Sequence, residues 1–259
     1  MITALLIRYL AFLLILFRVV GIVGFAPLFG SATVPRRVKI GLSILIAMML
    51  FPVVPVEAAA LPRSLSDMVL VAGKELAIGV TIGFVANLVF IGVQLAGTLV
   101  GRQVGFAIAN ILDPMTESEQ SVIAQFYFLF ALAIFVLIDG PGMLLRSMAV
   151  SFQKVPLGNF TIDGDTFEFL ALATQSIFVT GLRIAAPTVI ALFMVLIGLG
   201  FVARTVPQLN ILVVGFSLNI MVGLFVMIIS MTAVALVIRQ LLWEVVAFEV
   251  PDLITLFGS

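Results

Sequence analysis

Several charged side chains stand inside or at the edges of long apolar stretches, where they could carry protons or hold helices together. These residues are Arg8, Arg18, Lys74, Glu75, Asp139 and Arg183. A charge at the lipid-exposed centre of a membrane helix costs roughly 2.5–3.5 kcal/mol, so such residues normally face protein or water. For Arg8, Asp139 and Arg183, snorkelling or a local ion pair is one interpretation. The other is that the helices carrying these charges are surrounded by further subunits. We expect Arg18, Lys74, Glu75 and Arg183 to be buried or to lie between subunits.

Lys74 and Glu75 are neighbours in the sequence and therefore point about 100° apart on a helix. They cannot form an i,i+4 pair with each other, so each needs a partner elsewhere in this chain or in another. A transporter could use the two charges for proton coupling. A structural pairing is the favoured interpretation, because no second carboxylate stands one helical turn away to form a relay.

The composition excludes most catalytic chemistry. The chain has neither cysteine nor histidine. Disulfides, thiolate nucleophiles, the usual ligands of zinc, haem and iron–sulfur sites, and Ser-His-Asp or Cys-His arrangements are therefore ruled out. Lysine plus arginine equals aspartate plus glutamate at 13 each, so nothing points to nucleic acid. We expect no catalytic residues, no metal site and no cofactor.

The surroundings of these charges are unusually apolar. Of the 259 residues, 63% are hydrophobic and 10% are charged, against about 45–50% and about 25% in soluble domains. Six apolar stretches cover roughly 2–30, 38–54, 68–100, 120–145, 168–202 and 209–238. Most have the length of about 20 residues that crosses a bilayer. Such a chain needs lipid or the apolar surface of partner subunits around it.

The stretches are predicted to be helices, because a backbone away from water must satisfy its own hydrogen bonds and these runs do not alternate as barrel strands do. Pro187 stands inside the fifth stretch and should kink or break it, which would allow two shorter helices in a hairpin. No low-complexity linker divides the chain. We predict an all-α, integral-membrane-type fold of hydrophobic helical hairpins in one domain, 1–259.

A glycine pattern precedes an unusual loop. Gly97, Gly101 and Gly105 stand four residues apart and would share one helix face, which favours close packing. The apolar segment Phe106–Leu112 follows, and Asp113-Pro114 ends it. An ordinary helix–helix loop is one interpretation. Because loops normally meet water, the other is that the segment fills a cavity or a channel formed with other chains.

Two motifs carry a family resemblance. The pattern GxxxGxxxGF-(x)6-DP from Gly97 to Asp113-Pro114 resembles the central signature of the FliR family, and an apolar helix ending in Asp139-Gly140 follows it. The segment 203–224 resembles the second signature of that family. Its fixed points are Arg204, Pro207, Gln208, Asn210, Gly215 and Phe216. Arg18 with Gly21, and Glu75 with Gly79, also stand where the family places such pairs. The resemblance covers roughly residues 5–240.

The resemblance implies a non-enzymatic subunit of the flagellar type III protein export gate. Members of the FliR family assemble with FliP and FliQ in the basal body of the bacterial inner membrane, FlhB packs on the assembly, and unfolded flagellar proteins pass through it. The family places a loop inside the closed gate. The channel plug expected here consists of Phe106, Ala107, Ile108, Ala109, Asn110, Ile111, Leu112, Asp113, Pro114 and Met115.

Two alternatives stay open. The equivalent subunit of a virulence type III secretion system has a related sequence, although the DP loop and the PQLN segment look more like the flagellar branch. A small-molecule secondary transporter would show broken helices at corresponding places in two inverted halves. The sequence departs from the family pattern at Pro141-Gly142, where a bulkier polar residue is expected, so the shape of that turn is not predicted.

Overall fold

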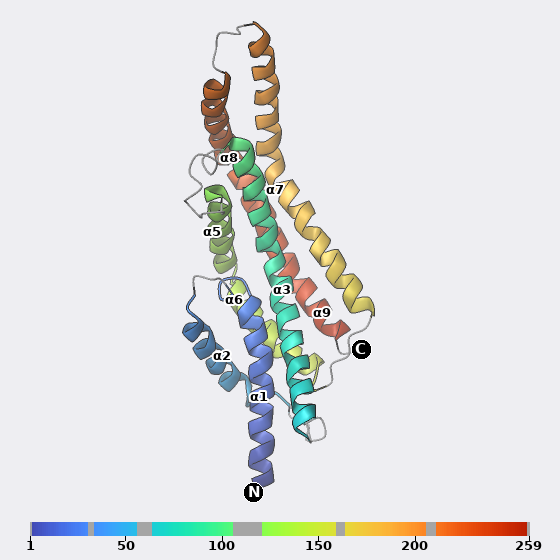
Figure 1. Ribbon diagram of the computed structural model, residues 1–259. Helices are drawn as coiled ribbons and strands as arrows, with labels where there is room; N and C mark the ends of the chain where they lie inside the picture. Colours follow the sequence, from blue (N-terminus) through green and yellow to red (C-terminus); the bar gives the residue numbers. More distant parts are fainter. Residues whose placement is uncertain are drawn as a thin grey trace. The chain divides into compact units, whose positions relative to one another are not determined.

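The computed structural model describes residues 2–30, 34–55, 64–105, 121–158, 164–205 and 211–257. The helices are α1 (Ile2–Phe25), α2 (Arg36–Leu50), α3 (Leu65–Val104), α5 (Val122–Leu137), α6 (Gly140–Lys154), α7 (Gly164–Thr205), α8 (Ile211–Glu244), the π-helix η2 (Val245–Glu249) and α9 (Val250–Leu256), as Figure 1 shows. No strand occurs in this part of the chain. The predicted all-α fold is confirmed.

The chain divides into two compact units, and several helices contribute to both. Unit 1 contains residues 1–88, 135–174 and 242–259, and unit 2 contains residues 89–134 and 175–241. The single domain expected from the sequence stays a prediction.

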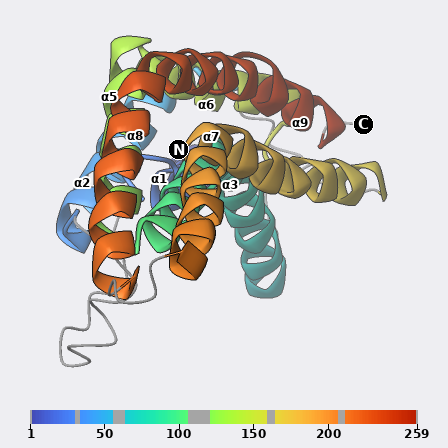
Figure 2. The same ribbon diagram turned by 90° about the horizontal axis from the view of Figure 1, so that it is seen from above.

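In unit 1, α1 packs against α2 and α3. The rings of Phe12 and Phe51, which follows α2 directly, meet edge-to-face at 6.0 Å between centroids. Helix α9, red in Figures 1 and 2, packs against α6. Helix α6 begins at a sharp turn, where Asp139 has a left-handed backbone (φ 60°) and α5 and α6 are bent by 68°. The side chain of Asp139 lies where a Cβ on Gly142 would stand, at 2.5 Å from the carboxylate Oδ1. The Gly142 position therefore leaves room for Asp139.

In unit 2, α7 and α8 run antiparallel. A Cβ on Gly215 would stand 3.2 Å from Leu199, and one on Gly223 would stand 3.5 Å from Leu192. Helix α3 contacts α5 through the rings of Phe90 and Phe128, with 6.0 Å between centroids. Pro187 lies inside α7, which is one helix of 42 residues. The hairpin considered from the sequence is therefore not formed there.

Four helical runs are long and apolar enough to cross a membrane within the described residues: Ile7–Phe25, Ser66–Val104, Thr166–Thr205 and Val213–Leu256. The bent pair α5 and α6 would add a fifth if it forms one span. In the 18-residue apolar window of each run, only 22% of the α7 residues and 11% of the α8 residues are buried within the chain, against 61% of the α3 residues. Helices α7 and α8 therefore present apolar side chains outward, as the composition predicts for a chain surrounded by lipid or partner subunits.

Candidate functional site

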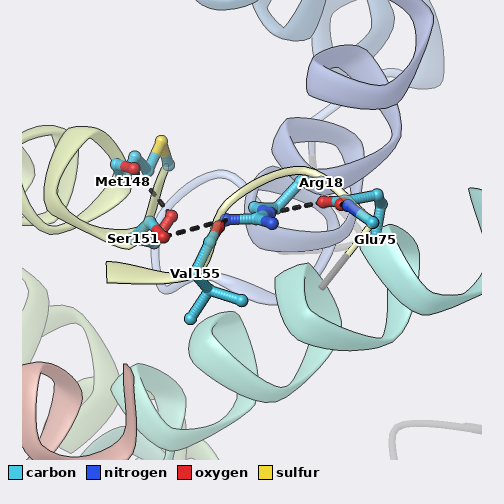
Figure 3. Close-up of polar contacts among 6 residues, drawn as sticks. Arg18, Glu75, Met148, Ser151 and Val155 are labelled. Carbon is cyan, nitrogen blue, oxygen red and sulfur yellow. Dashed lines mark hydrogen bonds and ion pairs between the residues drawn. The ribbon is translucent and has the colours of Figure 1, made fainter. Parts of the chain in front are cut away.

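A buried ion pair joins α1 to α3 in unit 1. The guanidinium Nε of Arg18 donates a hydrogen bond to the carboxylate Oε2 of Glu75 at 2.6 Å, and both side chains are 0% exposed (Figure 3). Arg18 is among the largest fully buried side chains of the described chain. Two charges are therefore fully removed from solvent and compensate each other at short distance.

The end of α6 completes the network around the pair. Arg18 Nη1 donates to the carbonyl oxygens of Ser151 at 3.0 Å and Val155 at 3.1 Å (Figure 3). The guanidinium carbon lies 4.3 Å from the centroid of the Phe152 ring, which is within reach of a cation–π contact. The backbone N–H of Gly158 donates to Glu75 Oε1 at 2.9 Å. One ion pair thereby holds α1, α3 and the segment 151–158 together.

Glycines set the distance between the two helices that carry the pair. A Cβ on Gly79 would collide with the carbonyl oxygen of Arg18, and a Cβ on Gly21 would stand 2.7 Å from the carbonyl oxygen of Leu76. Gly21 follows Arg18 by one turn, and Gly79 follows Glu75 by one turn. Because glycine has no side chain, the two backbones approach closely enough for a direct contact of Nε with Oε2.

This arrangement favours a structural clamp over a proton pathway. The described contacts of Arg18 and Glu75 are with each other, with backbone groups and with the Phe152 ring, and no third ionisable side chain takes part. Arg18 Nη2 is buried without a hydrogen-bond partner in the described part of the chain. Removing one member of a buried pair typically costs about 3–5 kcal/mol, because the other charge is left uncompensated.

The glycine face of α3 forms a second feature, in unit 2. A Cβ on Gly97 would collide with the backbone of Ala124, and one on Gly101 would collide with the hydroxyl oxygen of Ser121. Gly105 adopts φ +102°, which L side chains rarely adopt, and a Cβ there would stand 3.1 Å from the ring of Phe216 on α8. The end of α3 is thus packed closely against the start of α5 and against α8, and Gly105 and Ser121 flank the segment 106–120. Residues 97–105 with 121–124 are called the loop anchor below.

Comparisons with known proteins agree with these motifs. The model of the bacterial export proteins, family 1, matches residues 9–245. The flagellar biosynthetic protein FliR of Bacillus subtilis is 35% identical over 218 residues, covering 82% of each chain. FliR of Escherichia coli is 31% identical over 208 residues, covering 80% of this chain and 79% of the relative. FliR of Pectobacterium carotovorum is 33% identical over 206 residues, covering 80% of this chain and 78% of the relative.

The chain belongs to the FliR family of bacterial export proteins. The predicted resemblance is therefore confirmed, and it assigns the chain to flagellar biosynthesis, protein export and a membrane location.

The FliR-family signatures meet in the structure where both are described. Gly105 is the last of the three glycines in the first signature, and its neighbour Phe216 belongs to the second. Gly215 packs beside Leu199 of α7. Arg204 is exposed at the end of α7. Pro207, Gln208, Asn210 and the expected plug, 106–115, lie outside the described residues.

The charged residues singled out in this FliR-family sequence have different surroundings. Arg18 and Glu75 find their partners in each other, whereas Lys74 and Arg183 are exposed in the chain by itself. Contacts of Lys74 and Arg183 with other subunits stay a prediction. Asp139 lies 3.9 Å from Arg146 in an exposed ion pair. Arg8 is also exposed.

Sequence reasoning missed the contribution of α6. Ser151 and Val155 act through backbone oxygens and Gly158 through its N–H, which no side-chain pattern can reveal. The helix itself had a signal. Pro141 stands in its first turn, and the buried Leu144, Met148 and Phe152 recur every four residues, the spacing of a helix with one buried face.

Proposed function

We propose that this chain is a non-enzymatic subunit of the flagellar type III protein export gate, in which it lines and closes the channel for unfolded flagellar proteins. The family assignment supports a role in the flagellar export apparatus. The observation that carries the finer proposal is the loop anchor, because it brackets the segment Phe106–Met115 with close glycine contacts at both ends.

The loop anchor suits a segment whose two ends must stay in place while substrates pass. At its first end, Gly105 combines a left-handed backbone with contact to Phe216. At its other end, Ser121 lies against Gly101. The helices on either side of the segment are therefore packed together before and after it. A segment fixed at both ends can be displaced from a channel and can return to the same position.

The composition of the segment suits a seal. A protein-sized pore in an energised membrane must block ions at rest, and apolar constrictions do so by excluding water. Ala107, Ile108, Ala109, Ile111 and Leu112 are apolar, and Met115 has a flexible side chain that adapts to irregular gaps. In the proposed closed state these side chains fill the channel together with residues from partner subunits.

The proposed partners are FliP, FliQ and FlhB, within the basal body at the bacterial inner membrane. The outward apolar faces of α7 and α8 support contacts of this kind. Phe193, Phe201 and Phe225 are examples, with 52%, 65% and 64% of each residue exposed. Exposed aromatic side chains on long helices need either lipid or another protein. In this assembly, partner helices cover much of the surface that lipid would otherwise meet.

Deleting residues 106–112 tests the closing role. We expect the gate to assemble but to leak ions and small molecules, because the apolar body of the plug is gone while the loop anchor is intact. The measurement is ion permeability of cells that express the complete gate, with assembly followed by co-purification. A length-matched Gly/Ser replacement of 106–112 should leak as well, and the apolar exchange Ile108→Leu should not. A deletion variant that assembles fully and stays as tight as the unmodified gate would refute the plug.

Co-purification also separates the proposal from its alternatives. A gate subunit should be recovered with FliP and FliQ, whereas a secondary transporter should be recovered alone or as a homodimer. The relatives compared above carry flagellar names, which favours the flagellar system over a virulence secretion system. Restored swimming of a motility-deficient strain lacking its own family member would support the flagellar assignment.

A further inference from the structure

Helix α2 differs from the helices that can cross a membrane. Its 15 residues extend about 22 Å at 1.5 Å per residue, which is less than the hydrocarbon core of about 30 Å. Even so, one side of it is exposed and apolar: Leu45, Met48 and Met49 are 60%, 60% and 69% exposed. Its opposite side, with Ser43, Ile46 and Ala47, is buried in unit 1, where α2 packs against α1.

The exposed residues form one continuous stripe. Val38, Gly41, Leu45, Met48 and Met49 follow the three- and four-residue spacing of a single helix face, and each is exposed. No atom lies within 4 Å of a Cβ placed on Gly41, so the described residues leave the stripe open at this point. We call Val38, Gly41, Leu45, Met48 and Met49 the α2 stripe.

Positive charge is concentrated at one end of this stripe. Arg36 and Arg37 are exposed in the first turn of α2, and neither forms an ion pair with a described residue. Lys39, by contrast, donates to the carbonyl oxygen of Gly30 at 2.9 Å and so is held by the chain itself. The sequence contains no aspartate or glutamate before Glu57. Nothing acidic in this part of the chain competes for the two arginines.

We propose that α2 is an interfacial helix that binds anionic phospholipid. In this arrangement the α2 stripe lies among the acyl chains near the membrane surface, and Arg36 and Arg37 bind the phosphate of an acidic headgroup. Helices that lie in the membrane interface combine an apolar face with basic polar residues. The charge complementarity favours acidic lipid over zwitterionic lipid, because a headgroup without net negative charge leaves the two guanidinium groups uncompensated.

The lone tryptophan of the chain allows a direct test. Trp243→Phe removes the native fluorophore, and Met49→Trp then places a reporter on the α2 stripe. The full-length chain, in the membrane complex in which it accumulates, is reconstituted into vesicles of phosphatidylcholine and phosphatidylglycerol. One of the two lipids is brominated at a time. The signal is the difference from the same complex carrying Trp243→Phe alone, and the ratio of quenching by the two lipids gives their relative binding constant beside α2.

We expect both brominated lipids to quench the reporter, with brominated phosphatidylglycerol quenching it more strongly. Each arginine near an anionic surface contributes about 1 kcal/mol, so Arg36→Gln with Arg37→Gln should lower the preference for phosphatidylglycerol by about 30-fold. Arg36→Lys with Arg37→Lys should keep most of the preference for phosphatidylglycerol. Arg146→Gln with Arg239→Gln removes two exposed arginines from other helices and should leave it unchanged. High salt should weaken the preference of the unmodified helix.

Two results would overturn the proposal. Absence of quenching by either lipid would show that water or a partner protein covers the α2 stripe. Equal quenching by both lipids, unaffected by Arg36→Gln with Arg37→Gln and by salt, would show that α2 meets lipid without selecting acidic headgroups.

Discussion

Replacing either member of the buried ion pair should destabilise unit 1 severely. Arg18→Leu leaves the carboxylate of Glu75 buried without its counter-charge, and Glu75→Leu leaves the guanidinium in the same condition. Because both side chains are 0% exposed, water does not compensate for the loss. We expect each replacement to lower the free energy of unfolding by about 3–5 kcal/mol.

The double replacement, Arg18→Leu with Glu75→Leu, should lower the free energy of unfolding by much less than the sum of the two single replacements. Both charges are gone, and the main remaining defect is the buried carbonyl oxygen of Val155, which loses the donor Nη1 of Arg18. A buried acceptor without a partner costs about 1–3 kcal/mol. Gly158 also loses its acceptor, but this residue is half-buried and its N–H can meet water. Against a sum of about 6–10 kcal/mol for the two single variants, the coupling energy should be at least about 3 kcal/mol.

The assay is protease resistance of the chain in its membrane complex at a series of denaturant concentrations. In the regime of fast opening and closing, cleavage follows the equilibrium population of the open form. Arg146→Leu serves as the matched control, because Arg146 forms only the exposed 3.9 Å pair with Asp139 and should contribute no more than about 1 kcal/mol. Two results would refute a clamping role of the Arg18–Glu75 pair. One is a double variant whose loss of unfolding free energy equals the sum of the single losses. The other is a single replacement that costs no more than Arg146→Leu.

Three further predictions concern packing and assembly. Gly101→Leu should abolish complex assembly and motility, because the added side chain pushes α3 away from Ser121 at a cost of about 1–3 kcal/mol. A Cβ on Gly73 in the same helix meets no atom within 4 Å, so Gly73→Leu should be tolerated; comparable loss in both variants would contradict the packing argument. Expressed without partners, the chain should aggregate or be degraded, and a stable monodisperse monomer in mild detergent would count against the gate. Asn210→Ala should weaken recovery of FliQ or FlhB more than it lowers the amount of this chain in the membrane. Equal loss of both would indicate that Asn210 only caps the helix start.

The length of the apolar stretches was sufficient to predict the long helices. The six apolar stretches correspond to α1, α2, α3, α5, α7 and α8, since a chain without access to water must satisfy its backbone within each segment. The helices that escaped prediction are α6, η2 and α9. Helices η2 and α9 have five and seven residues, and α6 is less apolar than α2, which has the same length of 15 residues. For α7, Pro187 was expected to kink or break the helix; α7 continues through it, because a long apolar helix can accommodate a proline through its surroundings.

The sequence by itself determined which side chains required a partner, and only the tertiary structure decided what each partner is. The hydrophobic context of Arg18 and Glu75 already made an isolated buried charge too costly, and the family resemblance paired Arg18 with Gly21 and Glu75 with Gly79. That the two charges compensate each other, with Ser151, Val155 and Gly158 completing the site, depends on how α1, α3 and the end of α6 meet in space. Backbone oxygens and N–H groups are common to nearly every residue, so sequence cannot single out the ones that folding brings to a buried charge.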